Sequence, residues 1–116
     1  MNANTEKLKM ELLEFLKVNR GIKHKVDRKF LAAFLNISDR MVRRLIADLR
    51  TGGEPIISHS KSKGYWYYDR TVEDCFEADI MIRETFSRIK QLKRMISPIE
   101  RVIYGHEQIL IDFKTE

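Results

Sequence analysis

The stretch "SDRMVRRLIADLR", residues 38–50, combines four arginines with five large apolar side chains. A helix advances about 100° per residue, so the position of each side chain around the axis follows from its number. Measured from Asp39, the large apolar side chains fall between roughly 200° and 340°, and the arginines, together with a small alanine, fall between roughly 20° and 140°. The stretch is therefore predicted to be an amphipathic helix with an apolar face of Met41, Val42, Leu45, Ile46 and Leu49 and a basic face of Arg40, Arg43, Arg44, Ala47 and Arg50.

The side chains of the basic face are suited to binding nucleic acid. A guanidinium group bonds guanine edges or phosphate oxygens through two parallel hydrogen bonds. Base edges are met by the N-terminal half of a recognition helix, which favours Arg40, Arg43 and Arg44. Ala47 leaves room for close approach to a groove floor, and Arg50 is expected to meet a phosphate or to close the helix end. The alternative is an arginine-rich face that is only solvated.

The segments before this helix predict two more helices. Residues 5–18 carry apolar side chains at helical spacing, with Thr5 as a possible N-cap, and residues 22–26 are a possible short strand. Asp27 is expected to cap a second helix, and "NIS" at residues 36–38 is expected to form a tight connection to the third. The second helix is predicted to turn four side chains inward: Phe30, Leu31, Phe34 and Leu35.

The segment after the third helix predicts a β-hairpin. Gly52-Gly53 stops the helix, and residues 56–58 and 65–68 have strand composition on either side of "HSKSKG". Alternation along a strand predicts that about half of the aromatic side chains in residues 65–68 pack inward. The hairpin tip is predicted to reach the backbone or minor groove of a duplex with His59, Lys61 and Lys63. A polar loop that is basic by chance is the alternative.

Charge is distributed unevenly along the chain of 116 residues. Residues 17–63 hold 12 lysines and arginines against four acids, a net charge of +8, whereas the whole chain carries +5. Residues 69–84 are acidic. A basic block in a nearly balanced chain predicts a polyanion-binding face.

A long amphipathic helix is expected after Asp69, with apolar side chains every three or four residues. "SPIE" at residues 97–100 resembles a capping box and predicts a new short helix or a kink that ends at Gly105. "QILIDF" at residues 108–113 is expected to be a final strand or an ordered tail. The apolar stripe is predicted to form a dimer or partner interface, or an intramolecular brace, through Leu45, Ile82, Phe86, Ile89, Ile96, Ile99 and Ile103.

Residues 5–68 together resemble the winged helix-turn-helix domain of the biotin-repressor type. The matching positions are Leu31, Ala32, Leu35, Ser38, Val42, Ile46, Leu49, Arg50, Ile56, Ile57, Ser58, Gly64 and Tyr65. The resemblance implies a mainly α fold with a small β-hairpin (α+β) and a winged helix-turn-helix domain over residues 1–70. The amphipathic pattern after Asp69 predicts a helical extension over residues 71–116. The resemblance also implies duplex DNA as the ligand, held by Arg40, Arg43, Arg44, Lys61 and Lys63. The whole chain also looks like short phage-encoded proteins that carry this domain near replication or regulatory genes.

Two residues depart from the family pattern. Asp39 stands where the family often has a basic or neutral residue, and its charge suits a helix N-terminus but repels a nearby phosphate. Leu45 stands where an acidic residue is common, so the apolar face is wider, and we expect the C-terminal helix or a partner chain to cover it.

Two functions from different classes follow from these features. The first is a DNA-binding regulator of transcription or replication that acts as a homodimer. The second is a protein-interaction module that binds a replication or regulatory protein of a host, favoured by the acidic residues 69–84, by Leu45 and by the apolar C-terminal end.

Catalysis, cofactors, metal sites and membrane spans are not expected. The histidines are scattered without partners at metal-ligand spacing, and no glycine-rich phosphate loop is present. The only cysteine, Cys75, is predicted to be a buried inert thiol, and its isolation fits a reducing compartment such as the cytoplasm.

Overall fold

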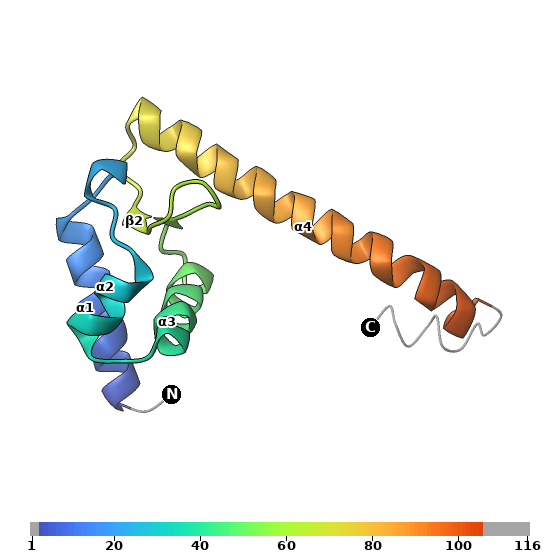
Figure 1. The fold of residues 1–116 in the computed structure, drawn as a ribbon, viewed down its shortest axis with the longest axis horizontal. Helices are drawn as coiled ribbons and strands as arrows, with labels where there is room; N and C mark the ends of the chain where they lie inside the picture. The colour runs from blue at the N-terminus through green and yellow to red at the C-terminus, as the bar shows by residue number, and fades with distance from the viewer. Residues whose placement is uncertain (1–2, 106–116) are drawn as a thin grey trace. The chain divides into compact units, whose positions relative to one another are not determined.

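The computed structural model describes residues 3–105, and it has the expected mainly helical α+β architecture of a winged helix-turn-helix with a long C-terminal helix (Figure 1). Three helices come first, then a two-stranded antiparallel hairpin, then one helix of 33 residues. The elements are α1 (Ala3–Val18), the 3-10 turn η1 (Ile22–His24), α2 (Arg28–Leu35), α3 (Asp39–Thr51), β1 (Ile56–Ile57), β2 (Trp66–Tyr67) and α4 (Val72–Tyr104).

The core lies between α1, α2, α3 and the hairpin. Burial of each large side chain stabilises the fold by about 1.5–3 kcal/mol, so this cluster holds the three helices together. Leu45 is fully buried within it, which corrects the expectation that α4 or a partner chain must cover this residue. The buried cluster is Leu12, Leu16, Leu31, Leu35, Val42, Leu45, Ile46, Leu49, Ile56 and Tyr67.

The connection between α2 and α3 is built as the sequence predicts. The Asp27 carboxylate accepts a 2.7 Å hydrogen bond from Phe30 N and caps α2. Asn36 ends α2 in the left-handed region at φ 54°, a conformation that asparagine tolerates better than most residues. The Ser38 hydroxyl then accepts from Met41 N at 3.1 Å and caps α3.

The prediction for the inner face of α2 is half wrong. Leu31 and Leu35 are buried, but Phe30 and Phe34 are 47% and 51% exposed. Each phenylalanine precedes a buried leucine by one position, which turns it about 100° away from the core. Both rings instead meet Phe15 of α1, with centroids 5.7 Å and 4.9 Å away, and form an aromatic cluster at the surface.

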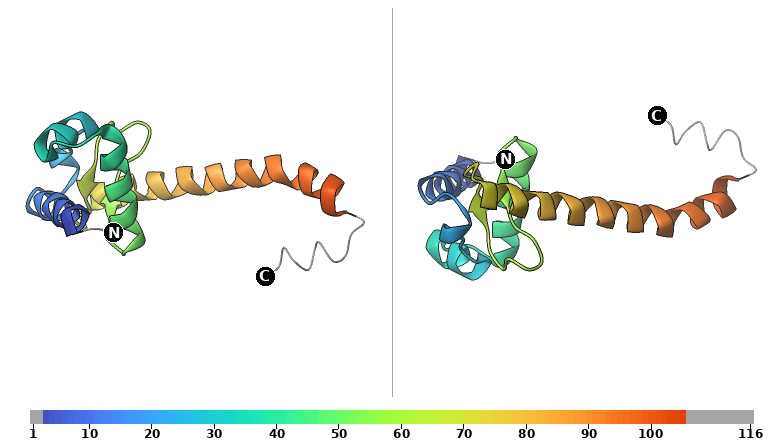
Figure 2. Two further views of the ribbon diagram at one scale, coloured as in Figure 1. Left: turned by 90° about the horizontal axis from the view of Figure 1, so that it is seen from below. Right: turned by 90° about the horizontal axis from the view of Figure 1, so that it is seen from above.

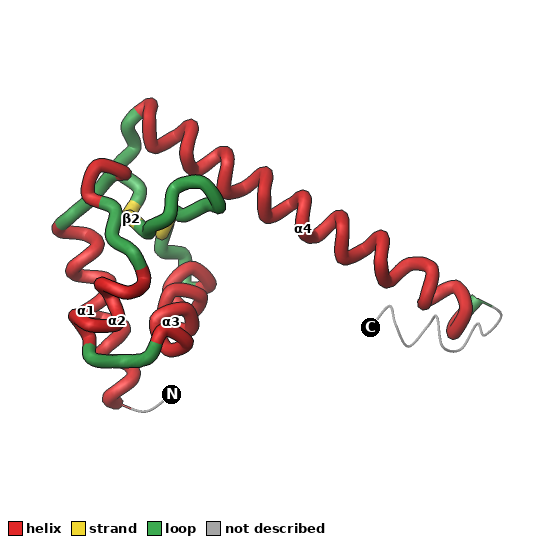
Figure 3. Tube along the Cα trace, viewed as in Figure 1, coloured by secondary structure: helices red, strands yellow, loops and turns green. Residues whose placement is uncertain are grey.

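The hairpin pairs Ile56 with Tyr67 and Ile57 with Trp66. Its short strands are drawn in yellow in Figure 3. Its strands are shorter than predicted, and Trp66 and Tyr67 are both buried although they point to opposite faces. Buried and exposed side chains do not alternate along β2, because both faces of this strand are covered. Tyr67 packs in the core, and the ring of His59 lies edge-on to Trp66 on the other face. The strand expected at residues 22–26 is reduced to the 3-10 turn and a single bridge from Val26 to Tyr65.

The first turns of α4 pack onto the winged helix. Asp74 is 1% exposed, and its carboxylate accepts hydrogen bonds from Ile22 N at 3.1 Å and from Asp69 N at 2.8 Å. Further along, the Met81 sulfur accepts from Ser58 N at 3.4 Å. These contacts extend the first compact unit to Met81, beyond the expected domain boundary at residue 70, and the described residues from Ile82 to Gly105 belong to a second unit.

Helix α4 does not restart at the predicted capping box. Figure 2 shows α4 as one continuous helix. The helix includes Pro98, and the Ser97 hydroxyl donates to Lys93 O at 2.8 Å rather than capping a new helix. The helix ends at Tyr104, before Gly105 as expected, and "QILIDF" lies outside the described residues. No helix in the described part of the chain is both long and apolar enough to cross a bilayer.

Two smaller expectations at helix starts are also corrected. Thr5 is not an N-cap, because α1 begins at Ala3 and contains this threonine in its first turn. Cys75 is exposed rather than buried, since the inward position in this turn of α4 is taken by Asp74.

Candidate nucleic-acid interface

The outward face of α3 carries the predicted set of basic side chains. Arg40, Arg43, Arg44 and Ala47 are all exposed, and the opposite face of the same helix is buried in the core. The serine cap and the core leucines fix the axis of α3, so the arginines project from a rigid element. A rigid helix with a small residue between long cations is suited to entering a major groove.

Asp39 at the start of α3 binds two arginines at once. Its Oδ2 accepts from Arg43 Nη2 at 2.6 Å, and its Oδ1 lies 2.8 Å from Arg28 Nε of α2. The Arg43 hydrogen bond is the main cause that holds the pKa of Asp39 below its ordinary value, with the charge of Arg28 adding to it. The carboxylate is therefore ionised at neutral pH, and Arg43 is oriented and partly neutralised before any ligand arrives.

Arg40 and Arg44 are different from Arg43. Neither makes an ion pair or a side-chain hydrogen bond with any residue between positions 3 and 105. Their guanidinium groups are thus available for base edges or phosphates without breaking an internal contact. Of the arginines on this face, these two have the lowest cost of engaging a duplex.

Arg50 does not belong to the exposed basic set. It is partly buried, its Nε donates to Ile56 O at 2.8 Å, and its Nη2 donates to Ser58 Oγ at 2.9 Å. The sulfur of Met81 lies 3.7 Å from the same nitrogen. Of the two roles expected for Arg50, these contacts agree with the one at the helix end: Arg50 joins the end of α3 to strand β1 and to the first turns of α4.

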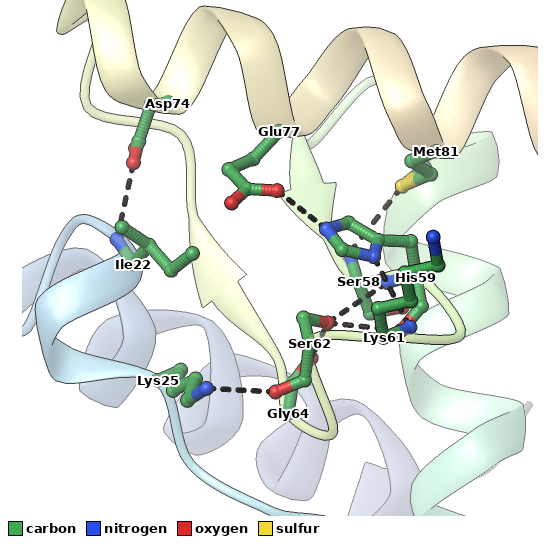
Figure 4. Close-up of polar contacts among 10 residues, drawn as sticks. All are labelled: Ile22, Lys25, Ser58, His59, Lys61, Ser62, Gly64, Asp74, Glu77 and Met81. Atoms are coloured by element: carbon green, nitrogen blue, oxygen red, sulfur yellow. Dashed lines mark hydrogen bonds and ion pairs between the residues drawn. The ribbon is translucent and has the colours of Figure 1, made fainter.

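The wing loop, residues 58–65, has an inner and an outer set of side chains (Figure 4). The His59 side chain is 4% exposed, and its Nε2 lies 2.5 Å from Glu77 Oε2 of α4. Ser62 is also buried and its hydroxyl accepts from His59 N, while Lys25 Nζ donates to Ser62 O at 2.8 Å. His59 is thus an internal anchor of the wing, which corrects its predicted role at the DNA surface.

The outer set of the wing loop consists of two exposed lysines. Lys61 and Lys63 project from the same tip that the inner set holds in place. Lys63 adopts φ 55°, and the next residue, Gly64, lies so close to Val26 that an added Cβ would come 3.2 Å from the Val26 carbonyl oxygen. The close approach to Val26 therefore disfavours a side chain at position 64, while Lys61 and Lys63 beside it are exposed.

A comparison with known families agrees with this arrangement. The HTH domain family matches residues 9–66, half of the chain, from α1 to the start of β2. The chain belongs to this helix-turn-helix family. Helix-turn-helix domains are DNA-binding modules, which supports a DNA-binding regulator in general terms. No curated protein and no solved structure matches the chain.

Within the HTH domain, the sequence predicted the exposed basic face of α3 but missed its internal partners. Arg28 reaches Asp39 across the α2–α3 turn, a contact between segments that no spacing rule predicts. The Asp39–Arg43 pair does follow the four-residue spacing of helical ion pairs. Two members of the acidic stretch, Asp74 and Glu77, are used inside the fold, which weakens the interpretation of residues 69–84 as a partner-binding patch.

Proposed function

We propose that this protein binds duplex DNA, with the outward face of α3 in the major groove and the wing lysines on the backbone. In this proposal it regulates transcription or replication in the cytoplasm and catalyses no reaction. The observation that carries the proposal is the exposure of Arg40 and Arg44, without internal partners among the described residues, on a helix whose other face is core. Membership of the helix-turn-helix family supports it.

The roles of the basic residues follow from their surroundings. Arg40 and Arg44 read base edges, because guanidinium groups without internal partners bond guanine O6 and N7 in pairs. Arg43 is held by Asp39 and contacts DNA only through its remaining donors. Ala47 lets the helix approach the groove floor. Lys61 and Lys63 contact phosphates, which position the protein without reading sequence.

Salt dependence tests this proposal directly. Each neutralised phosphate releases condensed counterions, so six to ten contacts lower the affinity by about three to five decades between 50 and 200 mM salt. We expect fluorescence anisotropy with labelled duplexes to show this steep decline and selection from random duplexes to recover a preferred site. Binding that is weak and indifferent to sequence at low salt would contradict the proposal.

A second candidate function rests on the aromatic cluster of α1 and α2. Phe15 and Phe34 line a surface groove of about 430 Å³, together with Val18, Asn19 and two acids at its edge, Glu11 and Glu14. Exposed apolar patches with polar rims mark binding sites for other molecules. An acidic edge repels DNA and favours an amphipathic helix with basic flanks, such as a segment of a host replication or regulatory protein.

This second function is tested with a synthetic peptide rather than with a lysate. We expect an amphipathic leucine–lysine helix to shift the amide signals of residues around Phe15 and Phe34 in NMR spectra of the labelled protein. A peptide with glutamate in place of lysine is the charge control. Equal shifts with both peptides, or none with either, would remove the support for this candidate.

A further inference from the structure

One face of α4 carries isoleucines at a strict spacing of seven residues. Ile82, Ile89, Ile96 and Ile103 are 42–52% exposed, and all lie on the second compact unit. Three residues after the first three of them come Thr85, Leu92 and Ile99. These seven positions are the a and d positions of a heptad repeat, the pattern of a coiled-coil seam.

The seven-residue period indicates what kind of surface covers this stripe. On a straight helix, a strict heptad stripe drifts by about 20° per repeat, or about 60° over three repeats. The stripe stays in continuous contact only with another helix that winds around it in a left-handed supercoil. A partner of globular shape does not follow this path, so the occupant is a helix.

The residues of α4 that would disrupt a coiled-coil interface, proline and charged residues, lie on the other faces of the helix. Pro98 and Ser97 fall at positions c and b, away from the isoleucines. Proline lacks the N–H of a regular helical bond, and on the outward side its missing bond is open to water. Charged side chains such as Lys90 and Arg94 occupy the same outward side. The stripe therefore continues past residues 97–100, where the expected new helix does not begin.

We propose that residues 82–104 pair with the same residues of a second copy in a parallel two-stranded coiled coil. A stripe of isoleucines is complementary to an identical stripe, because apolar side chains pack against one another. Within parallel coiled coils, isoleucine at every a position with Leu92 at the central d position favours two strands, whereas Ile99 at the last d position favours a larger number. Phe86 at position e and Met95 and Val102 at position g widen the apolar seam on both sides.

The parallel arrangement has a consequence for DNA recognition that rests on the proposed function. It brings the N-terminal ends of the two coiled-coil strands, next to Met81, to the same end of the pair. Both HTH domains are then connected by the chain to the same end of the pair. Such a dimer suits a duplex with two half-sites related by two-fold symmetry, because half-site symmetry mirrors protein symmetry.

Oligomeric state in the absence of DNA tests the pairing separately from the DNA function. We expect light scattering of the full chain to give a dimer at micromolar concentration and Ile89→Asp/Ile96→Asp to give a monomer. The control is Ser87→Asp/Gln91→Asp, which adds the same charge on the outward face and should stay dimeric. Near-ultraviolet circular dichroism of Trp66 reports whether the HTH domain of each variant is folded.

Crosslinking tests the orientation. In a Cys75→Ser background, a parallel pair predicts that Ile103→Cys forms a disulfide with its own copy, and so does Ile82→Cys. Mixing the two variants should give few heterologous crosslinks, whereas an antiparallel pair gives them preferentially. A full chain that is monomeric at high micromolar concentration, a trimer, or a dimeric Ile89→Asp/Ile96→Asp variant would overturn the proposal. Loss of DNA binding alone would leave it standing and would count against the proposed function instead.

Discussion

Oδ2 of Asp39 accepts two hydrogen bonds from Arg43, from Nη2 at 2.6 Å and from Nε at 3.0 Å. Asp39, at the start of α3, therefore binds one of the three arginines that are exposed on the outward face of this helix. It also binds Arg28 of the preceding helix. The face is thus divided into a restrained arginine, Arg43, and two arginines without internal partners, Arg40 and Arg44.

Replacing Asp39 with asparagine should increase affinity for DNA and reduce discrimination between sequences. The change removes a negative charge near the phosphates and releases Arg43 for a phosphate contact. We expect the slope of log affinity against log salt to steepen by about 0.9, the value for one added phosphate contact. Anisotropy titrations of cognate and scrambled duplexes measure both effects. An unchanged slope would show that Arg43 already contacts phosphate in the wild-type complex.

The same variant should also change the response of the fold to acid. The pKa of Asp39 lies below its ordinary value of 3.8, so its ion pairs stabilise the folded state above that pH and are lost as pH falls through the lowered pKa. The Asp39→Asn protein lacks this contribution at every pH. We expect the difference in unfolding midpoint between the two proteins to shrink below about pH 4. Thermal unfolding at several pH values measures it.

Replacing Arg50 with lysine should destabilise the fold rather than weaken a DNA contact. A lysine keeps the charge but not the planar fork that bonds Ile56 O and Ser58 Oγ together. Leaving partly buried acceptors unbonded costs about 1–3 kcal/mol of unfolding free energy. Denaturant unfolding measures the loss, and Arg44→Lys, on the open face, is the matched control that should unfold like the wild type. Equal stability of the two variants would contradict the structural role of Arg50.

Substitutions of His59 and Lys61 in the wing should have different effects, the first on stability and the second on DNA binding. His59→Ala removes a buried ring that contacts Trp66 and Glu77, and we expect a loss of about 1–3 kcal/mol in unfolding free energy. Lys61→Ala should leave stability unchanged and weaken binding to all duplexes about equally. Denaturant unfolding and duplex titration of both variants test this. A His59→Ala protein of normal stability would contradict the role of His59 as an internal anchor of the wing.

Asp74→Asn probes the junction between the HTH domain and α4. The carboxylate accepts from two backbone amides, Ile22 N and Asp69 N, at a site that is 1% exposed. An asparagine presents one carbonyl oxygen and one amino group, so one amide loses its acceptor, at about 1–3 kcal/mol. Hydrogen exchange at Ile22 and Asp69 should accelerate. Unchanged exchange at both amides would show that the carboxylate is not needed there.

The sequence predicted the fold because its signals are local. The caps at Asp27 and Ser38, the left-handed Asn36 and the amphipathic pattern of α3 are each determined by neighbouring residues, and all are confirmed. Two local signals also failed, the Thr5 cap and the capping box at residues 97–100. Other predictions that were wrong concern contacts between distant segments. The outward rings of α2 depend on where Phe15 of α1 lies, and the burial of Leu45 depends on how α3 meets the rest of the core.

In the candidate site, too, features determined by neighbouring residues were predicted and contacts between distant segments were not. Exposure of Arg40, Arg43, Arg44 and Ala47 follows from helical periodicity alone. The internal roles of Arg50 and His59 do not, because their partners Ile56, Met81 and Glu77 become neighbours only when the hairpin and α4 pack together. A basic residue in a basic stretch looks like a DNA contact until its partner is known.

The central claim is that Arg40 and Arg44 carry sequence recognition. The direct measurement compares Arg40→Ala/Arg44→Ala with Lys7→Ala/Lys90→Ala, a control that removes the same charge from other exposed positions, on a selected duplex and its scrambled version. We expect the arginine variant to lose about 1–3 kcal/mol per side chain on the selected duplex and to bind both duplexes alike, with unfolding unchanged. The lysine control should keep its preference. A double arginine variant that still prefers the selected duplex by the wild-type factor would contradict the account.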